Sequence, residues 1–340
     1  SRSFFSRCTI TIISQAKFSS ENSAAGRLDL LRKFAFKEAF RYNRGLNQSE
    51  FDISLSIKSE KIKKHPKIFS RLFGVSPEEF DQIVIKVIPL WQKKVLGQYK
   101  RPGRFFKLGL EEMILMLLLY YRSYMSLMSV GFMFGIDESR VCRNIKTLEP
   151  LLAKVMALCK TKHLSKEDVE NLIIDATEQP IEKPKRGQKA YYSGKKKRHT
   201  LKTEIRVALK NGKKPRIVHV SKTNPGSVHD LTVYRTEPPI SREIRAYADS
   251  GYQGLDKIHE ATEIPYKKSK HHVLDEEEKE YNSALSRIRI KIEHIIGDLK
   301  IFRILSDRYR NRRKRYHVKF NIIAGIVNFK NGFEIGRAHV

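Results

Sequence analysis

The hydrophobic pattern of this 340-residue chain changes near residue 166, and that change limits what the chain can fold into. From about residue 63 to residue 165 the pattern is that of helices. After that, short apolar runs bounded by turns predict strands, with a hairpin turn at KNGKK and short helices at GSVHDLTVYR and GLDKIHEAT. We therefore expect an all-α domain at residues 63–165. An α/β (α+β) domain with a mixed β-sheet flanked by helices should follow at residues 166–335.

The two ends of the chain carry no clear pattern. We assign residues 1–62 to a poorly patterned N-terminal extension and residues 336–340 to a tail. The first twenty residues contain no acid, many Ser, and scattered Arg and Lys. Such a segment fits either an organelle transit peptide or a disordered extension, and the sequence leaves that choice open.

The stretch SLMSVGFMFGIDESRVCRNIKTLEPLL predicts a helix, a tight turn and a second helix. Asp137 can cap the second helix, which we expect to reach about Leu148. Such a pair fits a helix-turn-helix, whose second helix enters the DNA major groove. An ordinary helical hairpin that packs on the next domain or on a second subunit is the alternative. The candidate DNA contacts of the second helix are Arg140, Arg143 and Asn144.

Two predicted strands end in an aspartate. The run VENLIIDAT leads to Asp175, and EIRAYADSGYQG leads to Asp249. A carboxylate is costly to bury unless a positive charge, such as a metal ion, offsets it. Strand ends point into the crevice where α/β proteins bind ligands, although a turn or cap role is the simpler alternative for any single Asp. Asp230, in VHDL, either caps a helix or competes with Asp249 for the second position.

A third acid lies on a long predicted helix near the C-terminus. In RIRIKIEHIIGDLK, residues 287–300, basic and apolar residues alternate only over the first positions, whereas the helical spacing of apolar residues continues on both sides. The acidic run DEEEKE at the start of the helix supplies a capping box. Arg289, Glu293 and Lys300 fall on one face at about 100° per residue.

Three acids from two strands and a helix would form a site of oxygen ligands suited to Mg²⁺. Two such ions, about 3.5–4 Å apart, activate a water or hydroxyl and stabilise the leaving oxygen in phosphodiester transfer. Asp175, Asp249 and Glu293 are therefore candidate catalytic residues and metal ligands, with Mn²⁺ as an alternative to Mg²⁺.

The charge of the chain is strongly positive. Its 67 Lys and Arg stand against 37 Asp and Glu, which gives a net charge of +30. Such a chain binds a polyanion, and nucleic acid is the first candidate. An anionic membrane surface and a ribosomal-type structural role are the alternatives. The most apolar run, MILMLLLYY, is too short to span a bilayer, and the three cysteines show no metal-binding spacing.

Four blocks in the second half of the chain, taken in order, are more specific than any one of them. They are DATEQPIEKPKRGQKAYYSGKKKRHTLK, TNPGSVHDLTVYR, ADSGYQG and RIKIEHIIGDLK. With these blocks, residues from about 68 to 333 resemble a bacterial insertion-sequence transposase of the DDE-superfamily-endonuclease type. The resemblance implies an RNase-H-like catalytic core behind a helix-turn-helix domain. It also implies that Asp175, Asp249 and Glu293 are the three metal-binding catalytic acids.

The resemblance further implies the reaction: hydrolysis frees a 3′-hydroxyl at the element end, and that hydroxyl attacks target DNA. A related transposase signature, Y-x2-R-x3-E-x6-K, is matched at Arg289, Glu293 and Lys300, but Ser286 stands at the Tyr position. This departure puts Tyr-dependent handling of the element end in doubt, but not the metal site. Two alternatives stay open: a non-catalytic DNA-binding protein derived from a transposase, and a DDE nuclease without strand transfer.

Basic residues around the acids are candidate DNA contacts. Arg289 and Lys300 would grip phosphates beside the scissile one, unless they pair with nearby acids. Residues 182–203 carry nine Lys and Arg against one Glu, and residues 308–317 contain no acid. A solvated charge run is the alternative for both stretches. The candidates in and near the first stretch are Tyr191 and Tyr192 for stacking, Arg198, His199, Asn224 and His229.

These expectations lead to a partner and a location. The partner is double-stranded DNA, both element ends and target, and a homodimer on DNA follows from the family because transposition joins two ends. We expect no membrane association and a cytoplasmic location at the bacterial nucleoid. The N-terminal pattern leaves organelle or nuclear targeting open.

Overall fold

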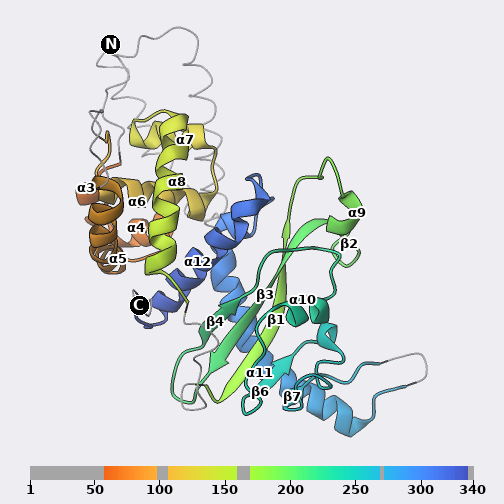
Figure 1. The fold of residues 1–340 in the computed structure, drawn as a ribbon. Coiled ribbons are helices and arrows are strands. Elements are labelled where there is room, and N and C mark those ends of the chain that lie inside the picture. The colour runs from red at the N-terminus through yellow and green to blue at the C-terminus, as the bar shows by residue number, and fades with distance from the viewer. Residues whose placement is uncertain (1–56, 98–105, 159–168, 269–271, 336–340) are drawn as a thin grey trace, which may run out of the picture.

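The computed structural model describes residues 57–97, 106–158, 169–268 and 272–335 (Figure 1). Most of the predicted N-terminal extension and the predicted tail lie outside these ranges. The order expected from the change of pattern is confirmed, because the helices of the first part end at Val155 and the first strand begins at Asn171.

The starts of the first helices follow from the sequence. The Ser76 hydroxyl accepts from the Glu79 N–H at 3.2 Å, and the Glu79 carboxylate accepts from the Ser76 N–H at 2.7 Å, which forms a capping box. The helices are α3 (Ser59–Lys63), α4 (Pro66–Phe73), α5 (Pro77–Trp91), which a π-helical turn (Gln92–Leu96) continues, α6 (Leu110–Ser123), α7 (Leu127–Phe134) and α8 (Glu138–Val155).

Helix α6 lies at the centre of this helical part. Its residues 113–121 are all buried, which explains the apolar run MILMLLLYY, since a helix that is apolar all round packs against neighbours on every side. Within the described ranges, no helix combines the length and the apolar character needed to cross a membrane.

The strands form one mixed sheet in the order β2–β3–β1–β6–β7, with β4 and β5 also paired to β3. β1 is antiparallel to β3 and parallel to β6, and β6 is parallel to β7. The expected hairpin is confirmed: β3 and β4 are antiparallel, and Gly212 in their turn has a φ of +72°. The strands are β1 (Asn171–Pro180), β2 (Tyr192–Ser193), β3 (Arg198–Leu209), β4 (Arg216–Val220), β5 (Asn224–Pro225), β6 (Arg245–Ala248) and β7 (Thr262–Glu263).

The helices of the second part are α9 (Gln188–Tyr191), α10 (Asp230–Thr236), α11 (Glu276–Lys300) and α12 (Tyr316–Lys330), with 3₁₀ turns at Ser250–Tyr252, Arg303–Leu305 and Arg313–Arg315. They cover both faces of the sheet (Figure 1). Ile173 of β1 packs in the core that contains Ile292 of α11, whereas Ile174 packs with Tyr234 of α10. Side chains of β1 thus alternate between two buried faces, which explains its continuous apolar run. The expected fold class, an RNase-H-like mixed sheet flanked by helices and preceded by an all-α part, is confirmed.

One apolar core runs from the helical part into the sheet part. Helix α12 packs against both α8 and β4. The approach is close at Gly325, where a Cβ would lie 2.2 Å from the Met156 carbonyl oxygen. Glu149 of α8 is buried and pairs with Lys319 Nζ of α12 at 2.8 Å. The expected domain boundary at residue 165 lies outside the described residues, and the two parts share this core across it.

The structure differs from the sequence expectations at three places. Strand β1 does not end at Asp175 but continues to Pro180, because β3 pairs with it along its whole length. Helix α8 runs past Leu148 to Val155, where further apolar residues join the core. The segment GLDKIHEAT forms successive turns rather than a helix, with Gly254 at a φ of +91°.

Candidate active site

The first two candidate acids follow neighbouring positions of parallel strands. In the register of β1 and β6, Ile174 is opposite Ala248, so Asp175 and Asp249 come next on adjacent strands. β6 ends there, whereas β1 continues along β3. This carboxyl edge of the parallel strands is the place where α/β proteins bind ligands.

The Asp175 carboxylate has little contact with solvent. Its pKa is raised to about 6, mainly by burial and further by the negative charges of Asp249 and Asp230. The Ala176 N–H, which donates to Asp175 Oδ1 at 2.7 Å, and the Arg289 guanidinium act in the opposite direction. The net rise means that the surroundings do not fully compensate the charged carboxylate.

Arg289 of α11 reaches these aspartates from the helix. Its Nη1 lies 3.7 Å from Asp249 Oδ1, and its side chain is only 16% exposed. Its Nε–H is buried and donates to no hydrogen-bond acceptor among the described residues. The sequence left two roles open for Arg289, a phosphate contact and a pair with a nearby acid, and the structure shows the pair with Asp249.

Glu293 and Lys300 share a cleft with Arg289, as their common helix face predicted. Asp175, Asp249, Glu293, Arg289 and Lys300 all line one cleft of about 580 Å³. The pKa of Lys300 is lowered by partial burial and by the charge of a nearby lysine, against the attraction of Asp175. The segment of β2 and the turn that follows it also lines the cleft, through Tyr192, Ser193, Gly194, Lys195 and Lys196.

The cleft offers the oxygen ligands that Mg²⁺ prefers, but the acids are not gathered into a finished metal site. Across the described ranges, no group of three or more His, Cys, Asp or Glu side chains is placed to hold an ion. The donor chemistry of Asp175, Asp249 and Glu293 and the uncompensated charge at Asp175 fit a divalent cation. A shared ion requires these side chains to draw closer together than they are here.

Asp230 and Glu178 are two further carboxylates that line the cleft. The strand register favours Asp249 as the second acid, because Asp230 begins helix α10 instead of following a parallel strand. Asp230 Oδ1 lies 2.7 Å from the Nζ of Lys202, a buried lysine of β3. The sequence reasoning missed Lys202, since a lysine in the basic run KKKRHTLK gives little sign of burial. The one available signal is the strand alternation that puts Lys202, Glu204 and Arg206 on one face.

The adjacent tyrosines have different surroundings. Tyr192 is 46% exposed and lines the cleft, and its ring meets the His199 ring edge-on at 5.7 Å between centroids. Tyr191 lies at the end of α9, where the Arg313 guanidinium is 4.3 Å from its ring centroid. Of the two tyrosines, Tyr192 is the one that lines the cleft. Arg198 is exposed, and its Nε donates to a backbone carbonyl of the neighbouring turn.

Two further candidates from the matching blocks, His229 and Asn224, also differ in whether they line the cleft. His229, which precedes helix α10, lines the cleft. Asn224 instead uses its side-chain amide to donate to the Lys222 carbonyl at 2.9 Å. The cleft thus brings in His229 but not Asn224.

The two basic stretches meet beside the cleft. The Tyr309 N–H donates to the Pro180 carbonyl at 2.8 Å, and Arg313 extends the contact to α9. Residues 308–317 therefore lie along the start of residues 182–203. We call the surface formed by these two stretches the basic ridge.

Helices α7 and α8 have the expected helix-turn-helix form. Asp137 Oδ1 accepts from the Arg140 N–H at 2.9 Å, which caps α8, and Gly135 in the turn has a φ of +64°. The Arg140 side chain pairs with Asp137, Nε to Oδ2, at 3.2 Å. Arg143 is exposed and Asn144 is half-buried.

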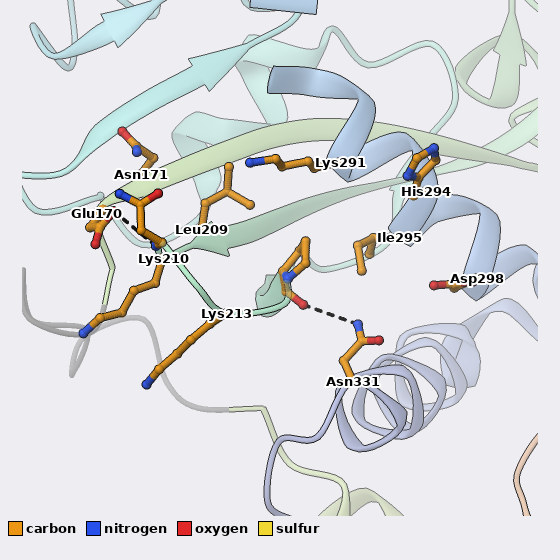
Figure 2. Close-up of a pocket in the computed structure, with 12 residues that line it drawn as sticks. Glu170, Asn171, Leu209, Lys210, Lys213, Lys291, His294, Ile295, Asp298 and Asn331 are labelled. Atoms are coloured by element: carbon orange, nitrogen blue, oxygen red, sulfur yellow. Dashed lines mark hydrogen bonds between the residues drawn. The ribbon is translucent and has the colours of Figure 1, made fainter. Parts of the chain in front are cut away.

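A second hollow, of about 340 Å³, lies against a different face of α11 (Figure 2). Lys291, His294 and Asp298 line it from the helix, and Glu170 and Lys213 line it from the sheet end. Basic and acidic side chains are mixed here, and none of the candidate acids takes part. Helix α11 therefore presents two polar faces, of which the face with Glu293 belongs to the cleft.

Two family models match the chain. One, described as "DDE superfamily endonuclease", matches residues 174–328, the part that holds the cleft. The other, described as "Helix-turn-helix of DDE superfamily endonuclease", matches residues 106–158, the part that holds α7 and α8.

Two curated proteins are similar along most of their length. A transposase assigned to insertion sequence element IS702 of Microchaete diplosiphon is 40% identical over 280 residues, which cover 81% of this chain and 98% of the relative. A transposase assigned to insertion sequence element IS112 of Streptomyces albus G is 23% identical over 246 residues, which cover 71% of this chain and 87% of the relative.

Proposed function

This chain belongs to the DDE-superfamily insertion-sequence transposases, and from that premise we propose that it cleaves the ends of its element and joins the freed 3′-hydroxyl to target DNA. The observation that carries the proposal is the cleft, in which Asp175, Asp249 and Glu293 stand beside the basic ridge. Acids suited to metal ions and bases suited to a DNA backbone occur side by side, as phosphodiester chemistry requires.

The three acids are the proposed catalytic residues and metal ligands. DDE endonucleases generally use divalent metal ions, and two Mg²⁺ ions, or Mn²⁺ in their place, are the proposed cofactors here. When bound, such ions supply an activated water or hydroxyl and stabilise the leaving oxygen. Asp175 and Asp249 offer carboxylates from adjacent strands, and Glu293 offers one from α11. The raised pKa of Asp175 supports this role. The charged carboxylate lacks a full positive partner in the protein, and a bound cation would supply one.

Basic side chains of the cleft would hold the DNA backbone. Arg289 and Lys300 are proposed to contact phosphates next to the scissile one, with Arg289 leaving Asp249 as DNA enters. Tyr192 offers an aromatic ring in the cleft on which an unpaired base can stack. Since Ser286 lacks the ring that the related signature has on α11, we assign base stacking to Tyr192 of β2 instead. The remaining contacts proposed beside the cleft are Tyr191, Arg198 and His199.

The helix-turn-helix is the proposed reader of the element ends. Helix α8 would enter the major groove, with Arg140, Arg143 and Asn144 as its contacts. We propose the division into residues 63–165 and 166–335 on the same grounds. Two ends must be brought together, so we propose a homodimer on DNA, in the cytoplasm at the bacterial nucleoid.

The full chain with labelled double-stranded element ends, target DNA and Mg²⁺ tests the proposal. We expect cleavage that leaves a 3′-hydroxyl at the element end, followed by joined products. Asp175→Asn, Asp249→Asn and Glu293→Gln should each abolish cleavage without abolishing binding. Binding should weaken steeply with salt, because each phosphate contact releases counterions.

Two outcomes would replace this proposal with its alternatives. Binding of element ends without cleavage at any Mg²⁺ or Mn²⁺ concentration would indicate a non-catalytic DNA-binding protein. Cleavage without joined products would indicate a nuclease that lacks strand transfer. Lys257→Met, an exposed lysine away from the cleft, is the control variant and should behave as the wild type.

A further inference from the structure

The face of β3 that turns away from α11 is charged where a sheet core is ordinarily apolar. Lys202, Glu204 and Arg206 occupy alternate positions there, with exposures of 7%, 0% and 0%. Arg206 Nε pairs with Glu204 Oε1 at 2.8 Å. Buried ion pairs are often no more stabilising than apolar side chains of the same volume, so stability alone does not account for this row of charges.

Lys202, the first charge of the row, is linked through Asp230 to the turn that begins at Asp249. Lys202 Nζ donates to the Val228 carbonyl at 2.7 Å and lies 2.7 Å from Asp230 Oδ1. The Asp230 carboxylate in turn lies against Gly251, where an added Cβ would be 2.4 Å from Asp230 Oδ2. Gly251 comes two residues after Asp249, so the chain of contacts from Lys202 ends at the Asp249 turn.

The other two charges of the row, Glu204 and Arg206, are linked to the same turn through Tyr252. The Tyr252 hydroxyl donates to Glu204 Oε2 at 3.4 Å, and Glu204 is held by Arg206. The turn itself is closed by the Ser250 N–H, which donates to Asp249 Oδ1. The Asp249 turn is thus held at Tyr252 by Glu204 of β3 and at Gly251 by Asp230, which Lys202 of β3 contacts, in addition to its own backbone.

We propose that Lys202 and Asp230 are positioning residues that set the place of the Asp249 carboxylate beside Asp175. Lys202 holds the Asp230 side chain, and Asp230 packs against Gly251 and fixes the turn. Lys202 also offsets the charges of Asp230 and of Glu178, whose Oε1 lies 3.8 Å from the Lys202 Nζ, which keeps these two carboxylates from acting as competing ligands. The consequence for metal binding rests on the proposed function, whereas the fixing of the turn does not depend on it.

Gly251→Ala is the sharpest test, because it changes no charge and disturbs only the contact with Asp230. The matched control is Gly297→Ala on α11, where an added Cβ meets nothing within 4 Å. We expect hydrogen–deuterium exchange over residues 249–254 to accelerate in Gly251→Ala without metal or DNA, and not in the control. The Mn²⁺ concentration for half-maximal binding, followed by electron paramagnetic resonance, should rise about 10–100-fold, as when partners of metal ligands are removed.

Lys202→Met tests the other end of the chain of contacts, with the exposed Lys257→Met as its control. We expect the same faster exchange over residues 249–254 and the same weaker Mn²⁺ binding, and Lys202→Arg should restore part of both. Circular dichroism checks that each variant is folded. Because removing a buried charge can unfold the chain, the result for Gly251→Ala decides where Lys202→Met does not fold.

The outcomes separate this inference from the proposed function. Unchanged exchange and unchanged Mn²⁺ binding in Gly251→Ala would overturn the positioning role. Asp230→Asn that removes Mn²⁺ binding as completely as Asp249→Asn would also overturn it, since Asp230 would then be a ligand. Faster exchange in Gly251→Ala, together with a wild type that binds no Mn²⁺ and cleaves no DNA, would support the positioning and reject the metal-dependent function.

Discussion

The guanidinium of Arg289 lies 3.7 Å from the carboxylate of Asp249. This pair brings a positive charge from α11 to the point where β1 and β6 present neighbouring aspartates. In the proposed reaction, that place belongs to metal ions and to the DNA backbone. We therefore expect the pair to open when either binds, and until then Arg289 offsets part of the negative charge of the two aspartates.

Arg289→Met should lower the melting temperature of the metal-free protein, because the aspartates lose their positive neighbour. A stability loss of about 1 kcal/mol corresponds to about 2–4 °C in a domain of this size. Added Mn²⁺ should raise the melting temperature of the variant more than that of the wild type, because the ion binds only the folded state. Thermal shift measurements across Mn²⁺ concentrations report both effects. Arg287→Met, exposed on the same helix, is the control, and an equal Mn²⁺ response in Arg289→Met and the wild type would contradict the pair's role.

Tyr192→Ala should weaken binding of element ends that carry unpaired terminal bases. Stacking of a base on an aromatic ring contributes about 1–3 kcal/mol, so a loss of fivefold or more in affinity is expected. Tyr192→Phe keeps the ring and should bind as the wild type, as measured by fluorescence anisotropy. Tyr191→Ala should have the smaller effect, since the face of that ring is covered by Arg313. A larger loss in Tyr191→Ala than in Tyr192→Ala would reverse the assignment.

Glu149→Ala should strongly destabilise the whole chain. Glu149 is 1% exposed, accepts from the Tyr121 hydroxyl at 3.0 Å and pairs with Lys319 at 2.8 Å. Its removal leaves the buried Lys319 charge without this partner, which costs about 3–5 kcal/mol. Urea denaturation measures the loss, and the exposed Glu280→Ala is the control. The double variant with Lys319→Met should lose less than Glu149→Ala alone, and an equal or greater loss would mean that the charge pair is not the cause.

Gly131→Ala should distort the turn between α7 and α8. An added Cβ would lie 2.4 Å from the Ile136 carbonyl oxygen, and the Ile136 N–H donates to the Gly131 carbonyl at 2.9 Å. The clash should cost about 1–3 kcal/mol. The preference for element ends over unrelated DNA should fall with it, because α8 would be wrongly placed. Gel-shift competition measures the preference, Gly297→Ala is the control, and a retained preference would argue against α8 as the reading helix.

Stability should fall as the pH is lowered, in part through His219. Its pKa is lowered to about 4, first by burial and then by Arg206, against the opposing effect of Glu237. The neutral imidazole therefore hydrogen-bonds to Glu237, with 3.0 Å between Nε2 and Oε2. An unfolded histidine titrates near pH 6.5, so the unfolded state takes up a proton first as the pH falls from about 6.5 to 4.

Between pH 7.5 and pH 5, this histidine alone should lower the free energy of unfolding by on the order of 1 kcal/mol. Urea denaturation at the two pH values measures the change, and His219→Gln should make it smaller. His317→Gln, an exposed histidine, should leave the pH dependence as in the wild type. An unchanged dependence in His219→Gln would mean that other groups set it.

Much of the cleft could be predicted because local patterns control it. The helical spacing of α11 puts Arg289, Glu293 and Lys300 on one face, and a strand that breaks at Ser250 indicates Asp249. The neighbouring placement of Asp175 and Asp249 could not be derived from such patterns, because it depends on the parallel register of β1 and β6.

Other features depend on contacts between segments that are distant in the sequence. Lys202 is buried because Asp230 and Val228, from a later segment of the chain, contact its amino group. GLDKIHEAT has a helical pattern, yet it folds as turns in which the buried His259 ring hydrogen-bonds to the Ile244 carbonyl at 2.8 Å. In both cases tertiary packing overrides the preference of the local sequence.

The close contact of Gly325 with Met156 has a consequence for how the protein is made. Helix α8 is synthesised early, whereas the surface that covers its end belongs to α12. During translation the side of α8 that packs on α12 stays uncovered until residues 316–330 have left the ribosome, so α8 gains this support late. We therefore expect a chain interrupted before α12 to have a less stable helical part than the full chain, because the side of α8 that α12 covers would be exposed to water.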